Sequence, residues 1–556
     1  MSFARLGPPL AIGLLAGPVL AGLAGTLFPA FGWLPALGGD RVSLDPFREL
    51  LAQPGLFRSS LVSLLSGLAA TLVALLGVAL FMAAHAGSRF FGRVQHLLSP
   101  LLSVPHAAAA FGLAFLVAPS GWLVRLVSPE LTGWTAPPDA LVVHDPFGLA
   151  MTAGLVVKEI PFLLLVALAA MPQVRLAETR RLAASMGHGR VAGFLFFAWP
   201  PVYRQIRLAV LAVLAFSTSV VDVAVILGPV TPPPLAVRLV GWMNDPDLEM
   251  RFFASAGALL QLGITALACL IWLALERLGH VVLTRLRDRG RRFAQDRGLR
   301  AISGVLPGLS AGAVFLGLLL LALWSVAGLW QFPDALPRSF SLRSWERALP
   351  RLDGPLWTTL ATGILAAALA TVLAILCLRR EDETRAPPGR LLWLVYLPLI
   401  VPQAAFLFGL QMLLIGVHAE PSLPALVFAH LVFVMPYVFL SLSDPWRAFD
   451  RRYETIAAGL GASRLKSFWR VRMPMMARAV LAAAAVGFAV SVGQYLPTLL
   501  IGAGRLTTIT TEAVALASGG NRRVIGVYAF LQMMLPAAGF AIASLVPALL
   551  WRRRSA

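Results

Sequence analysis

Few residues of this chain stand where they could do chemistry, and four of them lie in long apolar segments of its 556 residues. Lys158 and Glu159 fall in the middle of the segment 147–171, and Asp222 falls in the run FSTSVVDVAVILGP. Gln494, in the similar run FAVSVGQYLPTLLIG, is interpreted as the counterpart of Asp222 in a second half of the chain. A charge at the centre of a bilayer is costly, so it is kept where it is buried, paired or in contact with a polar cavity.

These four positions have two interpretations. Matched polar residues in both halves, Asp222 and Gln494, indicate side chains that face a shared central pathway. The alternative is a hydrogen bond between helices without contact to any solute. Lys158 and Glu159 are neighbours that point about 100° apart around a helix, so each is expected to pair with a different partner.

Two prolines stand at matched places in apolar segments, Pro105 in VPHAAAAFGLAF and Pro402 in VPQAAFLFGLQM. A proline inside a span leaves a backbone carbonyl without its helical donor. This predicts a packing kink in each segment, with a gate on the pathway as the alternative.

Enzyme chemistry finds little support. A phosphate-binding loop requires Gly-Lys followed by Ser or Thr, and the two lysines of the chain follow Val157 and Leu465. The chain therefore cannot be its own P-loop ATPase. Its eight histidines show no HExxH or paired spacing, so no metal site is predicted. Cys269 and Cys377 lie in apolar runs and are expected to be small core residues.

Two polar, basic stretches separate apolar segments and share one pattern. The first is RRLAASMGHGRVAGFLFFAWP, which ends at Pro200, and the second is FDRRYETIAAGLGASRLKSFWRVRMP, which ends at Pro474. Each predicts a short helix, a glycine turn, and a second helix that ends near the proline. Gly187 and Gly461 each precede that proline by 13 residues. Gly461 suits a left-handed C-cap, and Ser463 can cap the following helix.

Both stretches resemble the cytoplasmic loop of ABC-importer permeases, which is written EAA, three residues, G, nine residues, I-x-L-P. In that family the loop forms a short helix that docks into a groove on the ATPase subunit. The glutamate of the motif falls on Arg181 and Thr455, which weakens the expected charge contact with the ATPase, more so in the first copy. The ATPase-coupling residues that the resemblance implies are Arg181, Ala183, Ala184, Gly187 and Pro200, then Glu454, Thr455, Ala457, Ala458, Gly461 and Pro474.

Composition indicates a polytopic membrane protein, because 58% of the residues are hydrophobic, 13% are charged and the mean hydropathy is +0.80. We expect an all-α integral membrane fold with about 12 transmembrane helices in two six-helix repeats. The resemblance implies the type I ABC importer permease fold. The expected spans are 7–31, 57–83, 97–118, 147–171, 205–228, 252–276, 304–330, 356–378, 391–416, 423–442, 477–501 and 524–550.

The halves are read as a parallel internal repeat, because an even number of spans separates their matching motifs. Val104 and Val401 lie 297 residues apart, whereas Pro161 and Pro436 lie 275 apart, so the first half carries about 22 extra residues in an outer loop at 119–147. The predicted domains are 1–280, with a coupling loop near 173–204; a basic linker at 281–300; and 301–556, with a coupling loop near 443–477.

The net charge of +20 is compatible with nucleic acid, but its distribution indicates a membrane instead. With the N-terminus inside, inner segments hold 32 of the 46 Lys and Arg residues and outer segments hold 13. The positive-inside rule therefore predicts a bacterial inner-membrane protein with both termini and both coupling loops in the cytoplasm. The N-terminal segment is interpreted as a retained first helix rather than a cleaved signal peptide.

A fused two-half permease with these motifs is similar to the ferric-iron and thiamine group of importers. The segment VVDVAVILGPVTPPPLAVRLVGWMNDPDLEMRFFASAGALL looks most like a poorly characterised bacterial branch tied to thiamine. The resemblance implies a separate ATP-binding-cassette ATPase dimer that binds ATP and Mg²⁺, and a periplasmic or extracellular solute-binding protein. No cofactor is expected on this chain, and its other partner is the lipid bilayer rather than nucleic acid.

Two other classes remain open on hydropathy alone. A proton- or ion-coupled secondary transporter of 12 spans would need coupling carboxylates, for which Glu159 and Asp222 qualify, but it would not need matched inner loops. A membrane enzyme would need an acid pair, a histidine cluster or a nucleophile beside a base, and the sequence supports none of these.

Overall fold

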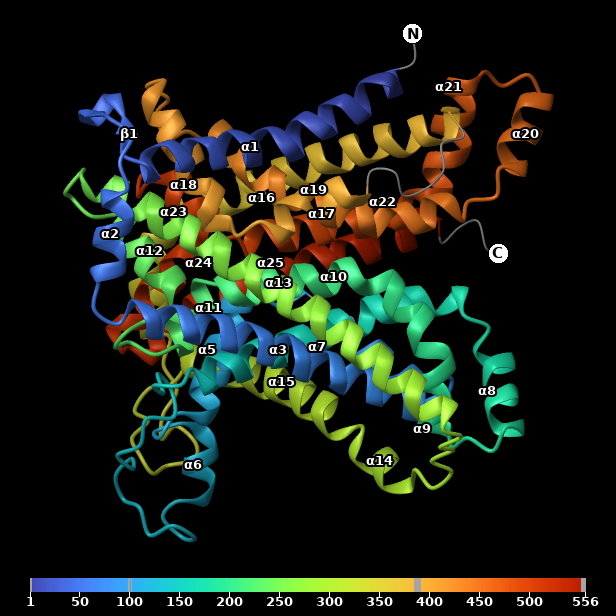
Figure 1. The fold of residues 1–556 in the computed structure, drawn as a ribbon, viewed down its shortest axis with the longest axis horizontal. Coiled ribbons are helices and arrows are strands. Elements are labelled where there is room, and N and C mark those ends of the chain that lie inside the picture. The colour runs from blue at the N-terminus through green and yellow to red at the C-terminus, as the bar shows by residue number, and fades with distance from the viewer. Residues whose placement is uncertain (1–2, 99–100, 102, 385–391, 552–556) are drawn as a thin grey trace.

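The computed structural model describes residues 3–98, 101, 103–384 and 392–551, and most of them are helical (Figure 1). Its β-structure in this part of the chain is the two-residue hairpin of β1 (Trp33–Leu34) and β2 (Gly39–Asp40) and one isolated bridge. The expected all-α membrane fold is confirmed. Parts of the expected spans 97–118 and 391–416, and the C-terminal end, lie outside the described residues.

The first half runs from the N-terminus to a long helix that leaves the bundle. Its elements are η1 (Phe3–Leu6), α1 (Gly7–Ala30), β1, η2 (Pro35–Leu37), β2, α2 (Asp45–Ala52), α3 (Leu56–His85), α4 (Arg89–Leu98), α5 (His106–Val117), α6 (Trp122–Val127), α7 (Leu149–Ala170), η4 (Met171–Gln173), α8 (Leu176–Ser185), α9 (Arg190–Gly193), the π-helix η5 (Phe194–Ala198), α10 (Trp199–Ser219), α11 (Asp222–Leu227), α12 (Leu235–Met243) and α13 (Met250–Asp288).

The second half repeats this order from its own first long helix, α15, onward. Its elements are α14 (Arg297–Ile302), α15 (Val305–Ser325), α16 (Arg343–Thr384), α17 (Leu392–Ile400), α18 (Gln403–Gly416), α19 (Leu423–Arg447), α20 (Arg452–Gly459), α21 (Arg464–Ser467), the π-helix η6 (Phe468–Arg472), α22 (Met473–Val492), α23 (Leu496–Gly502), α24 (Ile509–Ala515), η7 (Leu516–Gly519) and α25 (Arg522–Trp551).

Ten helices in the described part of the chain are long and apolar enough to cross a bilayer, and the bent pair α17 and α18 makes an eleventh if it is one span. The remaining expected span falls on α10, which carries Arg204 and Arg207 near its start and packs against α3, α7 and α13. The expected continuous spans 205–228 and 477–501 are wrong in one respect. Each is broken, because α10 ends before α11 begins at Asp222, and α22 ends before α23 begins at Leu496.

The first long helix of each half packs on the other half. Helix α1 crosses α18 where Gly22 meets Gly409, and α15 crosses α5 where Gly317 meets Gly112. A Cβ atom at Gly409 would collide with the carbonyl oxygen of Gly22, and one at Gly317 would lie 2.8 Å from Cα of Gly112. Gly112 and Gly409 are 297 residues apart, so the chain makes the same small-residue contact twice.

Alanine at Gly409 or Gly317 is expected to lower the free energy of unfolding by about 1–3 kcal/mol, because the added methyl group must separate two backbones. Thermal unfolding of the purified protein in detergent measures this. Gly13 on α1 and Gly312 on α15 have no atom within 4 Å of an added Cβ, so Gly13→Ala and Gly312→Ala are matched controls. Equal unfolding temperatures for the two pairs of variants would contradict the assigned contacts.

Candidate functional site

The two basic stretches form matching loops at one end of the bundle, on the right in Figure 1. In each loop a short helix, α8 or α20, is followed by a glycine turn and a single helical turn, α9 or α21. Gly187 has φ +80° and Gly461 has φ +81°, the left-handed region in which glycine carries no Cβ penalty. The predicted glycine turns are therefore confirmed.

The second helix of each loop does not end near the proline, and that expectation is wrong. Helix α21 passes through η6 into α22, with Pro474 at the second residue of α22, and α9 passes through η5 into α10 in the same way around Pro200. A proline lacks the backbone N–H that a continuous α-helix requires. Five residues of π-helix, which end two positions before each proline, change the hydrogen-bonding register, and this lets the helix continue.

The two loops cap their second helices differently. Ser463 accepts a hydrogen bond from the backbone N–H of Lys466, which confirms the predicted cap of α21. The first loop has Gly189 at this place, and the carboxylate of Asp296 takes over the capping. Its Oδ2 accepts from the backbone N–H of Val191 at 2.7 Å.

The basic linker lies against the first glycine turn. The backbone carbonyl of Arg292 accepts from the N–H of Gly189 at 3.3 Å, and a Cβ at Gly187 would lie 3.1 Å from Cδ of Arg292. A Cβ at Gly461 would meet nothing within 4 Å. The first turn is thus covered by residues 289–296, whereas the second turn is open.

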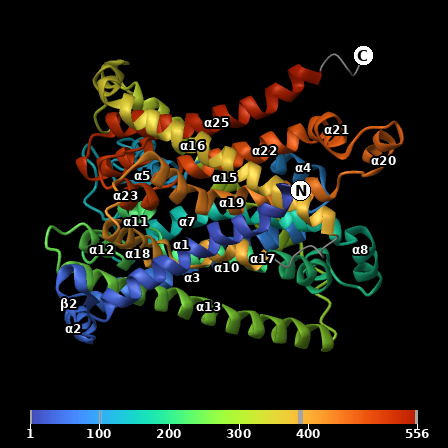
Figure 2. The same ribbon diagram turned by 90° about the horizontal axis from the view of Figure 1, so that it is seen from above.

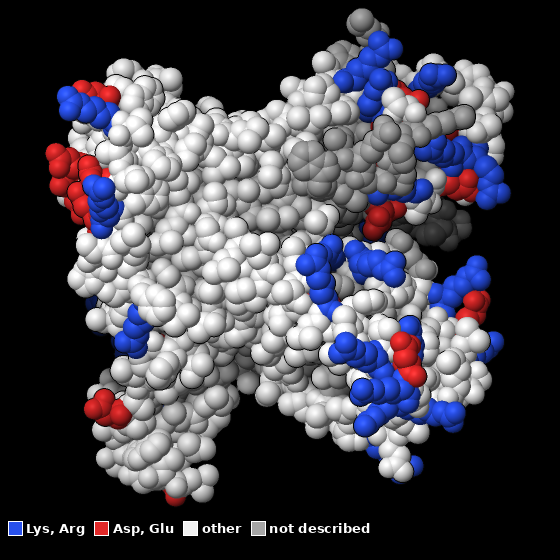
Figure 3. Space-filling model, viewed as in Figure 1, with Lys and Arg blue, Asp and Glu red and all other residues white. Residues whose placement is uncertain are grey.

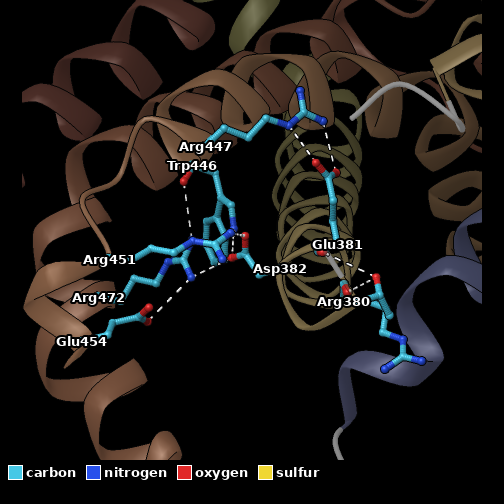
Figure 4. Close-up of polar contacts among 9 residues, drawn as sticks. Arg380, Glu381, Asp382, Trp446, Arg447, Arg451, Glu454 and Arg472 are labelled. Atoms are coloured by element: carbon cyan, nitrogen blue, oxygen red, sulfur yellow. Dashed lines mark hydrogen bonds and ion pairs between the residues drawn. The ribbon is translucent and has the colours of Figure 1, made fainter. Parts of the chain in front are cut away.

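Arg472, in η6, joins the second loop to the end of α16 (Figure 4). Its Nη1 lies 2.8 Å from Oδ2 of Asp382 and 3.6 Å from Oε1 of Glu454, and its side chain is 5% exposed. The guanidinium carbon lies 4.0 Å from the centre of the Trp446 ring, and the indole N–H donates to Asp382 at 2.9 Å. Charge pairing and cation–π contact together hold this arginine.

Two further arginines bind the acidic end of α16. Arg447 donates to both carboxylate oxygens of Glu381 at 2.9 and 3.1 Å, and Arg451 pairs with Asp382 (Figure 4). Residues of α19, the following turn and η6 therefore converge on two consecutive acids. The sequence analysis missed this cluster, since no counterpart of Arg472 exists in the first loop, where Ala198 stands 274 residues earlier.

The first loop is held at the matching place by a backbone group. Arg190 donates to the carbonyl oxygen of Ala86 at 3.1 Å, and Arg180 also donates to it. Ala86 follows the last residue of α3, His85, which precedes Asp382 by 297 residues. Burial and the charge of Arg190 lower the pKa of Arg180, and burial and Arg300 lower that of Arg190.

Two apolar residues on each loop helix face solvent in the same register. Leu182 and Met186 on the first loop are 65% and 52% exposed. Ile456 and Leu460 on the second, each 274 residues later, are 60% and 84% exposed. The sequence analysis did not single out Leu182 or Met186, although the repeat offset points to both. Of the sequence-predicted residues, Ala183 is buried; Gly187, Pro200, Glu454, Ala457 and Pro474 are half-buried; and Arg181, Ala184, Thr455, Ala458 and Gly461 are exposed.

The ionisable residues of α7 lie in the interior. Glu159 is buried and its Oε1 lies 3.4 Å from Nε2 of His106, the first residue of α5. Lys158 is also buried, and its Nζ donates to the carbonyl oxygen of Leu101 at 2.9 Å. Sequence reasoning had no partner for either residue, because His106 and Leu101 lie more than fifty positions away.

The other sequence-predicted pathway residues lie at helix ends. Asp222 begins α11, whereas Gln494 comes two residues before α23, so Gln494 precedes the position that matches Asp222 at an offset of 274. Both side chains are buried. Pro105 and Pro402 are the N-cap residues of α5 and α18, and Pro402 lies at the 94° bend between α17 and α18.

Comparison with known proteins agrees with this architecture. A family model described as "Binding-protein-dependent transport system inner membrane component" matches residues 385–552. The inner membrane ABC transporter permease protein YnjC of Escherichia coli K12 is 33% identical over 508 residues, 91% of each chain. The thiamine transport system permease protein ThiP of the same strain is 28% identical over 73% of each chain. The molybdenum transport system permease protein ModB of Mycobacterium tuberculosis is 29% identical over 35% of this chain and 75% of its own.

Replacing Arg472 with glutamine is expected to loosen the second loop, because it removes the charge that pairs with a largely buried Asp382. The loss in stability is about 3 kcal/mol, at the low end for a broken buried pair, since Arg451 still binds Asp382. Hydrogen exchange of residues 446–476, with the unfolding temperature, measures it. Arg452→Gln breaks an exposed ion pair with Asp450 on the same loop and is the matched control, with no change expected.

Asp296→Ala and Ser463→Ala each remove one cap, and we expect each to speed hydrogen exchange only in its own loop. The cost is about 1 kcal/mol in either case. If one substitution speeds hydrogen exchange in both loops, or in neither, then the two caps do not stabilise their loops independently.

Proposed function

The chain belongs to the permease subunits of ATP-binding-cassette transporters, and from that premise we propose that it forms the solute pathway of an importer driven by a separate ATPase. It is a multi-pass inner-membrane protein, and the relatives that identify it are transport permeases rather than enzymes. Membership of this family argues against the two other classes that hydropathy left open, the secondary transporter and the membrane enzyme.

The matched apolar pairs on the two loops carry the proposal. Leu182 with Met186, and Ile456 with Leu460, stand four residues apart, so each pair lies on one face of a short helix. Exposed apolar side chains on a projecting helix are the anchors with which a helix binds a partner's groove. Two such helices at one end of the bundle fit a partner that presents two equivalent grooves, as an ATPase dimer does. ATP and Mg²⁺ would be bound there and not on this chain.

The anchors of the loops support force transfer. The second loop is tied to α16 through Arg472 and Asp382, and the first to the end of α3 through the carbonyl of Ala86. His85, the last residue of α3, and Asp382, near the end of α16, are separated by the repeat offset of 297. A displacement of either loop by the ATPase would therefore move a long helix of the bundle, and with it the pathway between the halves.

We propose that the end with the loops faces the cytoplasm. Figure 3 shows Lys and Arg side chains gathered at this end, on the right, whereas the opposite end carries fewer basic residues and several acids. The positive-inside rule supports this orientation. An external solute-binding protein would then deliver cargo at the opposite end, where α6 and the irregular segment 128–148 project.

For cargo we propose a cation, with thiamine to be tested first and ferric iron second. Two buried carboxylates, Glu159 and Asp222, lie at helix positions that the sequence assigned to a pathway. Thiamine carries a positive charge, and a relative matched over 73% of this chain is a thiamine transport system permease. Calorimetry of the partner solute-binding protein with each compound would decide between them.

Aspartate at Ile456 and Leu460 together is expected to weaken ATPase binding about thirtyfold or more, because burying one such side chain stabilises a complex by about 2 kcal/mol. Copurification with the P-loop subunit, and ATP-driven uptake in proteoliposomes, measure the effect. Leu131→Asp is the control, since Leu131 is 82% exposed in the 128–148 segment at the other end. Normal ATP-driven uptake by the double variant would refute the docking assignment.

A further inference from the structure

A cavity of about 630 Å³ opens between α22 and α25, at the end of the bundle that carries the two loops. Arg470 and Arg478 supply its charge, and Pro474, Met475, Pro547 and Ala548 supply much of its apolar wall. Figure 2 shows α25 diverging from α22 toward its C-terminal end.

The two arginines of this cavity have no counter-charge within the described part of the chain. Arg472, which lies between them in sequence, is buried against Asp382, whereas Arg470 and Arg478 are exposed and form neither an ion pair nor a side-chain hydrogen bond with any described residue. Arg478 lies on α22, four residues after Pro474. The nearby residues Met475 and Val471 are apolar and partly exposed. Two unpaired guanidinium groups therefore border an apolar wall.

The first half has a polar cluster between α10 and α13. Arg207 lies 2.8 Å from Glu276, the hydroxyl of Tyr203 donates to Glu276, and the indole of Trp272 donates to Tyr203. The residues 274 positions after Tyr203, Arg207 and Glu276 are Ala477, Leu481 and Leu550. The second half therefore lacks the residues of this cluster at the repeat offset.

We propose that this cavity binds an anionic phospholipid, with the phosphate on Arg470 and Arg478 and the acyl chains along Met475, Pro547 and Ala548. Arginine binds phosphate through paired N–H donors, and basic pockets between transmembrane helices hold anionic headgroups. Membrane lipid is the fitting occupant because both helices are apolar and long enough to span the bilayer, and the protein leaves most of their apolar residues unburied.

The site lies next to the second loop, because Arg470 and Val471 belong to η6 itself. A lipid bound there would contact the same π-helix whose Arg472 pairs with Asp382. Lipid binding does not depend on the proposed coupling to an ATPase, and it can be tested without that partner.

The test uses the full chain purified in detergent, to which phosphatidylglycerol or phosphatidylcholine is added, with native mass spectrometry as the readout. We expect a phosphatidylglycerol adduct, and binding about thirtyfold weaker in Arg470→Gln/Arg478→Gln, since each arginine contributes about five- to sixfold. Arg204→Gln is the matched control, because Arg204 is an exposed arginine that precedes Arg478 by 274 residues and does not line this cavity. The doubly lysine-substituted variant keeps the charge and is expected to keep most of the binding.

Unchanged phosphatidylglycerol binding in the double glutamine variant would overturn the proposal, as would equal loss in Arg204→Gln. Equal binding of phosphatidylcholine would also overturn it, because the charge would then play no part. Inorganic phosphate that competes as strongly as the lipid would identify a phosphate site rather than a lipid site. The unfolding temperature in lipid-free detergent, unchanged in both glutamine variants, shows that any loss of binding does not come from misfolding.

Discussion

The ion pair between Asp382 and Arg472 connects the second loop to the longest helix of the bundle. Helix α16 has 42 residues, so it reaches about 63 Å from the loop toward the opposite end. Past the middle of this helix the hydroxyl of Thr359 accepts a hydrogen bond from the backbone N–H of Ile509, the first residue of α24. One charged contact thus links η6, through a single helix, to α24.

The two halves share one order of helices, but different kinds of contact fix their loops in place. The second loop depends on carboxylates and aromatic rings, which contribute most when desolvated and geometrically matched. The first depends on one backbone carbonyl and on a linker that covers its glycine turn. A homodimeric permease would present identical loops, whereas a fused chain is free to make them unequal. The two loops of this protein accordingly present different surfaces that share one arrangement of exposed apolar side chains.

Much of the fold could be predicted from local patterns. The lengths of the apolar segments predicted the spans, and the repeat offset predicted which elements of the two halves correspond. Gly461 predicted a turn and Ser463 a helix cap, because both features depend on residues that are close in sequence. The contacts that escaped prediction are between distant residues. Asp296 caps a helix 105 positions away, and Arg472 binds an acid 90 positions earlier. The breaks before α11 and α23 escaped as well, since hydropathy reports burial and not backbone continuity.

The exchange of first helices between the halves has a consequence for biogenesis. The hydroxyl of Thr26 in α1 donates to the carbonyl oxygen of Ala405, 379 residues later, beside the glycine crossing of α1 and α18. While the ribosome is still translating the middle of the message, α1 has already entered the bilayer without its permanent neighbour. Lipid or an insertase must shield its small-residue face during that interval. The contact between α1 and α18 forms only after the second half has been inserted. Neither half of the chain therefore completes its packing without the other.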